Sequence, residues 1–370
     1  MNLSMDVQEE TASFGSFGEA QETLLEQPWS DGLPCVPPTR DLVERMIEAG
    51  GRDSAHILGS LSTRGEIQLS VGQAAICAVM AGCKPAYFPV VLATWDALFD
   101  PRFNLHSALT SSGGSALMGI VSGPYAQEIG MNADTGAFAP GNRANATIGR
   151  SIRLAALAVF KAIPKELDAS AFGNGGKYSF HYAERTPPAG WPALHEQLGY
   201  TPDTTTVTMM ACDGPRQIAH RWKPTAEGFL RTLAATMKDP SQNATGCSSS
   251  YVIALGPEHA GLLADAGMKP ERIRELLSEF SHTSAQELLA AGIEIERTTN
   301  HYSKPDAEGR ILTAMPGHIL VVTAGGYGSG WSAVMPCYTT LATHHPTSRP
   351  VRLPGRPTPQ QISASQLAFG

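Results

Sequence analysis

The sequence predicts an α/β protein made of two α/β units, the second of which contains a parallel sheet. A chain of 370 residues is long for a single compact core. Its apolar content of 42% is typical of a globular protein. Strand-like and helix-like segments alternate in the last third of the chain, and this alternation favours parallel strands.

The composition divides the chain into three parts. Residues 1–27 are polar and carry acidic side chains without an apolar core, so we expect a flexible tail. A change in composition at residues 238–250, "KDPSQNATGCSSS", separates an N-terminal α/β domain (28–240) from a C-terminal α/β domain (241–370). The second domain ends in a proline-rich tail. The sequence shows no internal repeat.

Helices of the N-terminal domain begin at residues that commonly cap helices. Thr39 is expected to cap a helix that is closed by Gly50 and Gly51. Ser70 is expected to cap a helix over residues 70–83 that is apolar on nearly every face, as a helix buried all round would be. A second apolar helix, "YFPVVLATWDALF", follows it.

Two buried strands and two further helices complete this domain. Residues 115–123 and 204–211 read as strands. Between them, Asn142 is expected to cap a helix that runs to about Lys161. Residues 225–238 have the spacing of an amphipathic helix.

The C-terminal domain follows a strand–turn–helix pattern. The segment "YVIALGPEHAGLLADAG" reads as a strand, a short turn and a helix, and "PERIRELLSEF" reads as a second, amphipathic helix. The segment "HILVVTAGGYGSGWSAV" reads as a strand and a glycine loop followed by a helix. Glu258 and His259 then lie in the first turn of a helix, directly after a strand, where α/β enzymes commonly keep functional groups.

Charge and composition exclude several classes of protein. A net charge of −7 argues against a nucleic-acid binder. No apolar run is long enough for a membrane-spanning helix, and the acidic N-terminus does not resemble a signal peptide. We therefore expect a cytoplasmic protein with no membrane partner. Its six cysteines include no Cys-x-x-Cys pair, so they predict neither a disulfide framework nor a structural zinc site.

The start of the helix after Asn142 is the strongest candidate for a substrate-binding site. At helical spacing, Arg143, Thr147 and Arg150 share one face near the positive end of the helix dipole. Two guanidiniums, a hydroxyl and free backbone amides can together hold a carboxylate or phosphate. Asn145 belongs to the same predicted binding set. The alternative is that the arginines pair with acidic residues of a neighbouring element.

A glycine loop after the late strand is a second candidate anion site. Gly325, Gly326 and Gly328 can present a nest of backbone N–H groups. The loop is neither a Walker motif nor a nicotinamide or flavin dinucleotide fingerprint. A purely structural turn is the alternative.

Three residues are candidate catalytic groups. Cys83 ends the buried helix beside a lysine, which can activate a thiol, although most cysteines on apolar helices are small core residues. His181 and Glu184 can act as acid and base or as two metal ligands. On a strand their spacing sends them to opposite faces. The sequence contains no recognised spacing of metal ligands, so it neither predicts nor excludes a bound metal.

The chain resembles the bacterial family of UGSC-motif proteins, whose relatives include component B of glycine, sarcosine and betaine reductases. The stretches that carry this resemblance are "DGLPCVPPT", "AAICAVMAGCKPAYFPVVLA", "GNRANATIGRSIRLA", "KYSFHYAE" and "ILVVTAGGYGSGWSAV". The resemblance implies a cytosolic enzyme that acts on a small organic molecule. The cysteine-Gly-Ser-Cys tetrad that defines the family does not occur, and the nearest string is "TGCSSS" at residues 245–250.

These observations lead to one main functional hypothesis and two alternatives. The main hypothesis is an enzyme of lyase, hydratase or hydrolase type whose substrate is a small carboxylate-bearing molecule held by arginines. The first alternative is a thiol-dependent reductase or thiol nucleophile that uses Cys83, Cys35 or Cys247. The second is a non-catalytic subunit of a reductase-type complex. We expect the protein to form a homo-oligomer.

Overall fold

The structure, a computed structural model, describes residues 13–62, 66–222, 224–238, 250–293, 305–338, 345–359 and 361–362. It has the α/β architecture that the sequence predicts, with one mixed sheet of eight strands and helices on its outer surfaces. The helices are α1 (Phe17–Leu25), α2 (Arg40–Gly50), α3 (Val71–Ala81), α4 (Phe88–Leu98), α5 (Leu105–Thr110), α6 (Pro124–Glu128), α7 (Arg143–Ala158), α8 (Leu194–Gln197), α9 (Ala226–Met237), α11 (Pro257–Asp265), α12 (Pro270–Phe280) and α13 (Ala285–Ala290).

The strands of the large sheet come from both halves of the chain. They are β3 (Ala116–Ser122), β4 (His181–Ala183), β5 (Thr206–Cys212), β6 (Arg216–Ala219), β7 (Ser250–Leu255), β10 (Ile319–Thr323), β11 (Trp331–Cys337) and β12 (Thr347–Pro350). Two small antiparallel pairs lie outside this sheet: β1 (Ile57–Ser62) with β2 (Glu66–Ser70), and β8 (His282–Ser284) with β9 (Arg310–Leu312).

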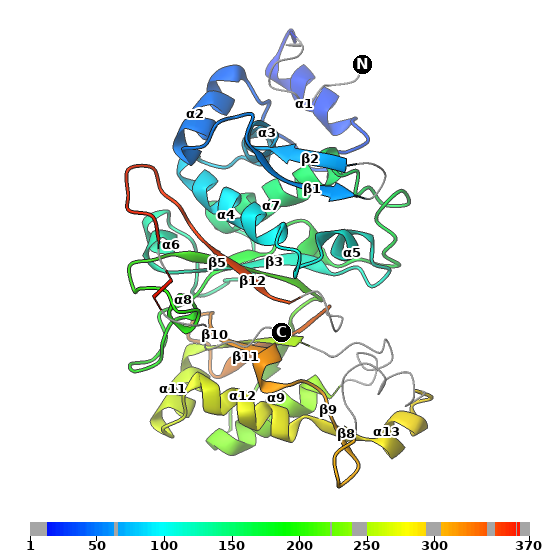
Figure 1. Ribbon diagram of the computed structural model, residues 1–370, viewed down its shortest axis with the longest axis vertical. Helices are drawn as coiled ribbons and strands as arrows, with labels where there is room; N and C mark the ends of the chain where they lie inside the picture. The colour runs from blue at the N-terminus through cyan, green and yellow to red at the C-terminus, as the bar shows by residue number, and fades with distance from the viewer. Residues whose placement is uncertain are drawn as a thin grey trace.

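The molecule is layered as helices, strands, strands and helices (Figure 1). The strand order β10-β7-β11-β5-β3-β4 brings one face of the first half of the sheet against one face of the second half. The two edge strands approach each other at their ends, where the Arg185 N–H donates to the Thr323 carbonyl over 2.9 Å. Helices α3, α4 and α7 cover one outer face, and α9, α11 and α12 cover the other.

The two halves of the sheet repeat the same strand arrangement. In each half a central strand, β3 or β7, pairs in parallel with an edge strand and antiparallel with an inner strand. The inner strands β5 and β11 each take one further antiparallel partner, β12 and β6. Each central strand is followed by Gly-Pro and a helix, α6 or α11. The repeat is therefore structural, although none is visible in the sequence.

The halves join where β5 meets β11. Their register contains one residue pair, Cys212 with Cys337, and the two Sγ atoms lie 2.9 Å apart in the buried interior. The grouping of elements differs from the expected boundary near residue 240, since β6 and α9 lie in the second half and β12 returns to the first.

Several local predictions from the sequence are confirmed. Ser70 opens α3 with a capping box in which its side chain and that of Gln73 bond each other's backbone N–H. Asn142 caps α7 by accepting from the Asn145 N–H. Gly51 ends α2 in the left-handed conformation. Parallel pairing in the C-terminal part is present between β7 and β10.

Three expectations need correction. Residues 331–337 form strand β11, not a helix, because the alternating side chains of this segment fill both faces of a sheet. The sheet of the C-terminal part is mixed, since β11 runs antiparallel to β7. The expected flexible tail contains α1 between residues 17 and 25, which Ser16 caps and which buries Ala20 and Leu24. No helix among the described residues is long and apolar enough to cross a membrane.

The two Gly-Pro turns predict matched stability effects. A Cβ atom at Gly123 would clash with the carbonyl oxygen of Thr204, and one at Gly256 would clash with the carbonyl oxygen of Trp331. Gly123→Ala and Gly256→Ala are each expected to lower the free energy of unfolding by about 2 kcal/mol or more. Chemical denaturation of the purified variants measures this loss.

Gly261→Ala is the matched control, because this glycine lies inside α11 and a Cβ there has no neighbour within 4 Å. It is expected to raise stability by up to about 1 kcal/mol through helix propensity. If Gly123→Ala and Gly261→Ala behave alike, the close approach at the turn does not determine stability.

Candidate functional site

A hydrogen-bonded chain of three side chains lies at the ends of β3 and β4. The Ser122 hydroxyl is 2.5 Å from Glu184 Oε2 and 2.7 Å from His195 Nδ1. Ser122 is the last residue of β3, Glu184 follows β4, and His195 lies in α8. Because β3 and β4 are parallel, their carboxyl ends share one edge of the sheet, where α/β proteins commonly place functional groups.

Backbone groups hold this chain in place. The Leu194 N–H donates to Glu184 Oε2 over 2.8 Å, and the His195 N–H donates to Ser122 Oγ over 3.1 Å. Ser122 is fully buried and His195 is nearly so. The start of α8 therefore aligns all three side chains.

The same distances fit two arrangements of protons. In the first, the Ser122 hydroxyl donates to an ionised Glu184 carboxylate and His195 Nδ1–H donates to Ser122 Oγ. In the second, a protonated Glu184 donates to Ser122, whose hydroxyl donates to His195 Nδ1. In both, Ser122 uses one donor and two acceptor sites, which is its full capacity. The arrangements differ by one proton, so the chain can take up or release a proton without breaking.

Burial sets the protonation of both ends of this chain. It raises the pKa of Glu184 to about 7, against the opposing effect of the hydrogen bonds from Ser122 and Leu194. Burial also lowers the pKa of His195, which keeps its imidazole neutral. A carboxyl group with a pKa of about 7 suits proton transfer near neutral pH.

Of these three residues, Glu184 is half-buried, whereas Ser122 and His195 are buried. Both hydrogen bonds to the carboxylate go to Oε2, and Oε1 receives none from the described residues. The buried His195 Nε2 also lacks a hydrogen-bond partner in the described part of the chain.

His181 lies on the other face of β4 from Glu184, as strand alternation predicts. Its ring is packed between Gly119 of β3 and Gly149 of α7, where a Cβ atom on either glycine would meet the imidazole. Burial lowers the pKa of His181 to about 4, and neither ring nitrogen has a partner among the described residues. The predicted pairing of His181 with Glu184 as acid and base is therefore not formed.

Cys83 and Arg143 lie together at the start of α7, away from Glu184. The Arg143 Nε–H donates to the Gly82 carbonyl over 2.9 Å, and the rest of the side chain is exposed. Burial raises the pKa of the Cys83 thiol to about 12, and hydrogen bonds with Thr147 and Ser151 oppose this rise only in part. The Thr147 hydroxyl donates to the Arg143 carbonyl.

Arg150 makes the ion pair that was the alternative to an anion site. Its Nε and one terminal nitrogen bind the two oxygens of Asp31 at 2.7 and 2.9 Å. The remaining donors reach the carbonyls of Leu33 and Pro34 and the thiol of Cys35. The Asp31 side chain is only 3% exposed. Its ion pair with Arg150 therefore holds the segment that precedes α2 against α7. Arg143 and Arg150 therefore do not form a shared clamp.

The side-chain amide of Asn145 is also used within the fold. Its Oδ1 accepts from the Asn132 N–H, and its Nδ2 donates to the carbonyls of Asn132 and Ala137. These bonds tie the loop before α7 to the first turn of the helix. Both Nδ2 hydrogens are therefore used, and the side chain has no donor left for an anionic substrate.

Only Gly328 of the predicted nest donates to an anion, together with Ser329, and the protein itself supplies that anion. The N–H groups of Gly328 and Ser329 both donate to Glu258 Oε1 at 2.9 Å. Gly325 N–H donates to the Ala133 carbonyl, and Gly326 packs against Asp134 and Thr135. The loop therefore connects the two halves of the molecule.

His259 is satisfied within the second half. Its Nδ1 lies 2.8 Å from Ser332 Oγ and its Nε2 lies 3.1 Å from the His220 carbonyl. Its ring stacks on Phe229 with a centroid distance of 3.9 Å. These contacts describe a structural histidine.

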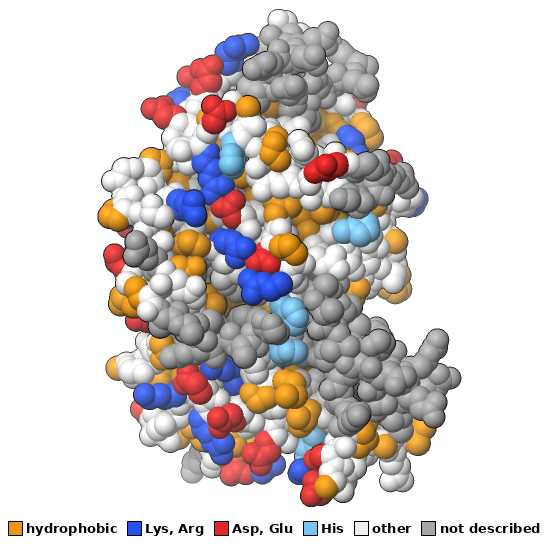
Figure 2. Space-filling view, viewed as in Figure 1, with side chains coloured by type: hydrophobic (Ala, Val, Ile, Leu, Met, Phe, Trp, Pro, Cys, Tyr) orange, Lys and Arg blue, Asp and Glu red, His pale blue; other side chains and the backbone are white. Residues whose placement is uncertain are grey.

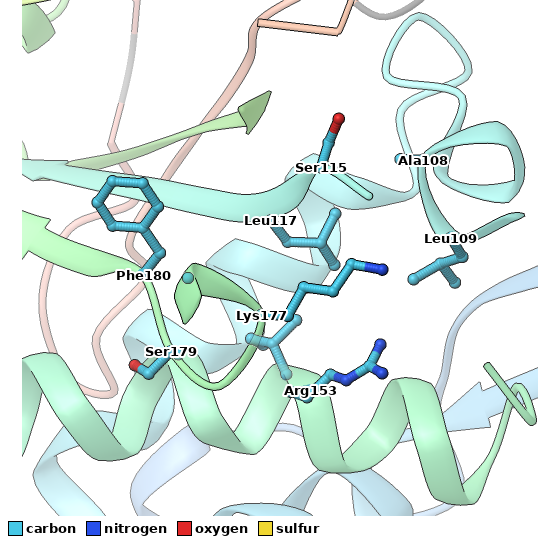
Figure 3. A pocket seen from close by; sticks show the side chains of 11 residues that line it. Ala108, Leu109, Ser115, Leu117, Arg153, Lys177, Ser179 and Phe180 are labelled. Carbon is cyan, nitrogen blue, oxygen red and sulfur yellow. The ribbon is translucent and has the colours of Figure 1, made fainter. Parts of the chain in front are cut away.

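Two cationic side chains, Lys177 and Arg153, line a small cavity between α7 and β3 (Figure 3). Lys177 and Arg153 both reach the buried Asp168, with nitrogen–oxygen distances of 2.7 and 3.3 Å. The cavity has a volume of about 20 Å³, which accommodates a water molecule and no organic substrate. The cluster is therefore an internal ion-pair network.

Among the residues that the structure describes, no group of three or more His, Cys, Asp or Glu side chains is placed to hold a metal ion. Cys247 lies outside the described residues.

Comparison with models of known protein families gives no match, and comparison with curated proteins gives none either. The resemblance to the UGSC-motif family therefore stays a prediction.

Sequence reasoning identified Glu184 and missed Ser122 and His195. Ser122 is separated from Glu184 by 62 residues and from His195 by 73. The available signal was the sequence Ser122-Gly123-Pro124 at the end of a buried strand, next to the candidate strand that contains Glu184. Parallel pairing of these two strands would have placed both side chains at one edge.

The ion pair of Arg150 predicts a large stability effect. Arg150→Met keeps most of the apolar side chain and leaves Asp31 buried without its partner. We expect a loss of about 3 kcal/mol in the free energy of unfolding, measured by urea denaturation. Arg143 is exposed and begins the same helix. Arg143→Ala is expected to lower the free energy of unfolding by about 0.5 kcal/mol or less. Similar small losses in both variants would contradict a structural role for Arg150.

Proposed function

We propose that this protein is an enzyme that transfers a proton to or from a small organic molecule, in a reaction of lyase, hydratase or hydrolase type. The observation that carries the proposal is the hydrogen-bonded chain Glu184–Ser122–His195, in which both hydrogen bonds to the Glu184 carboxyl group go to Oε2. Glu184 is the proposed general acid or base. Ser122 and His195 are positioning residues that hold its carboxyl group and share its proton.

The pKa of Glu184 supports this role. A carboxyl group with a pKa of about 7 is present in both protonation states at neutral pH. It can therefore act as a base in one step and as an acid in the next. Glu184 Oε1, which has no hydrogen bond to the described residues, is the atom proposed to face the substrate.

The thiol alternatives have less support. Cys83, with a pKa of about 12, is a protonated thiol at neutral pH, and the thiolate is the nucleophilic form. Burial also raises the pKa of Cys35, although Arg150 acts in the opposite direction. Cytoplasmic location and a homo-oligomeric state remain predictions from the sequence.

The activity is tested by exchange of carbon-bound hydrogen with deuterium in the solvent, followed by NMR over a panel of small carboxylic acids. The wild-type protein is expected to exchange one position of a substrate. Glu184→Gln is expected to lower the rate by about 100-fold or more, since it removes the acid–base group. Glu227→Gln, an exposed glutamate on α9, is the control and is expected to keep the full rate. Equal rates in Glu184→Gln and the wild type would refute the assignment.

The positioning role of Ser122 has its own readout. Ser122→Ala removes the hydroxyl that bonds Glu184, so the pH at which the exchange rate changes is expected to move. His195→Asn is expected to move it as well. Variants that lose rate without any change in the pH profile would indicate only a structural role.

The raised pKa of Glu184 also predicts a pH-dependent stability. The unfolded chain releases this proton near pH 4.5, whereas the folded protein keeps it up to a pH of about 7. The folded state therefore binds more protons between these values, and stability falls as the pH rises through this window, by up to about 3 kcal/mol. Glu184→Gln is expected to remove this fall, and Glu227→Gln is expected to retain it. Denaturation midpoints between pH 5 and pH 8 measure both.

A further inference from the structure

A second candidate binding site lies on the outer surface of the first half. It is a groove of about 630 Å³ beside the C-terminal end of α4 and the end of β12. Its walls include Arg52, Arg349, Arg352 and His56, and none of these residues takes part in the Glu184 chain. Basic and acidic side chains alternate down this part of the surface in Figure 2.

The charges of the groove leave a positive surplus. Arg52 pairs with Asp96, and both Arg102 and Arg349 pair with Asp100. Together with Arg352 and Asp53, four guanidiniums and three carboxylates lie in and around the groove. The surplus is local, because the whole chain has a net charge of −7.

Acidic partners fix two of the guanidiniums. Both terminal nitrogens of Arg52 bind the two oxygens of Asp96. Arg349 binds Asp100, whose side chain is 6% exposed, over 2.7 Å. The adjacent Thr347 hydroxyl donates to the Ala97 carbonyl and so holds this end of β12 against α4. A guanidinium that is already held in place loses little entropy when it binds a further anion.

Arg352 is the arginine of the groove that is most available to a ligand. It follows Val351, whose N–H donates to the Thr205 carbonyl, so its backbone is anchored. Its side chain is exposed and has no hydrogen bond or ion pair with the described residues. An anion bound in the groove could therefore pair with the guanidinium of Arg352 and would lie near those of Arg52 and Arg349, which their acidic partners hold in place.

The floor of the groove is apolar. Phe99, Leu58 and Pro101 line it. The Phe99 ring is fixed by stacking on Trp95 at a centroid distance of 5.6 Å and by an edge contact with Phe160 at 6.0 Å. Apolar side chains beside guanidiniums suit a ligand that has an anionic end and an apolar body.

We propose that this groove binds a small organic anion, with its carboxylate or phosphate on Arg352 and its apolar body on Phe99. The site is independent of the proposed chemistry at Glu184, because it lies on the outer face of the sheet and shares no residue with that chain. The groove is thus a binding site additional to the proposed active site.

Isothermal titration calorimetry tests this site with three probes: benzoate, benzamide and inorganic phosphate. Benzoate carries both features of the expected ligand, benzamide lacks the charge, and phosphate lacks the ring. Benzoate is expected to bind saturably and more tightly than either of the others. Arg352→Gln is expected to weaken benzoate binding by about 10-fold or more, as for the loss of a charge-assisted hydrogen bond.

Two controls make the result specific. Arg272→Gln removes an exposed guanidinium from α12, in the other half of the molecule, and is expected to leave benzoate binding unchanged. Glu184→Gln is also expected to leave it unchanged, which separates this site from the proposed active site. Absence of saturable benzoate binding, equal binding of benzamide, or an equal effect of Arg352→Gln and Arg272→Gln would each overturn the proposal. Tighter binding of phosphate than of benzoate would overturn the role of Phe99.

Discussion

The apolar interior between the two halves of the sheet is the constraint on which the rest of the structure depends. Apolar side chains from β3, β5, β7, β10 and β11 meet there. A polar side chain on this inner face needs a hydrogen-bond partner or a place at the end of a strand. Ser122 and Glu184 occupy such a place, since they are the inner-face residues at the ends of β3 and β4. The proposed proton-transfer chain therefore lies where the interior ends.

The repeated strand arrangement shows how one half differs from the other. Ser122 pairs in register with Thr206, and Leu255, which precedes the second Gly-Pro turn, pairs with Ser332. Leu255 faces outward into the apolar core under α9, α11 and α12, so it supplies no hydroxyl to the interior. The nearby His259 bonds through both ring nitrogens, and the nearby Glu258 carboxylate accepts from the Gly328 and Ser329 N–H groups. The second half thus uses its polar groups for internal bonds, and the first half keeps a titratable chain.

Local features of the fold could be predicted from the sequence, and distant contacts could not. The Asn142 cap of α7 and the capping box at Ser70 depend on residues within three positions, so their pattern is readable. The partner of Arg150 is Asp31, 119 residues away, and no local signal distinguishes that ion pair from an anion site. The helix predicted for residues 331–337 is wrong, because a short apolar run after a glycine loop fits a helix as well as a strand.

The same distinction explains what could be learned about the candidate site. Glu184 was recognisable as a carboxyl group beside a strand end, but its pKa depends on burial and on Ser122, 62 residues earlier in the chain. His181 was equally conspicuous, and Gly119 and Gly149 enclose it so that it stays neutral. Residue type identifies which side chains can titrate. Only the packing of β3, β4 and α8 determines that Glu184 does so near neutral pH, and this is the physical basis for placing the chemistry there.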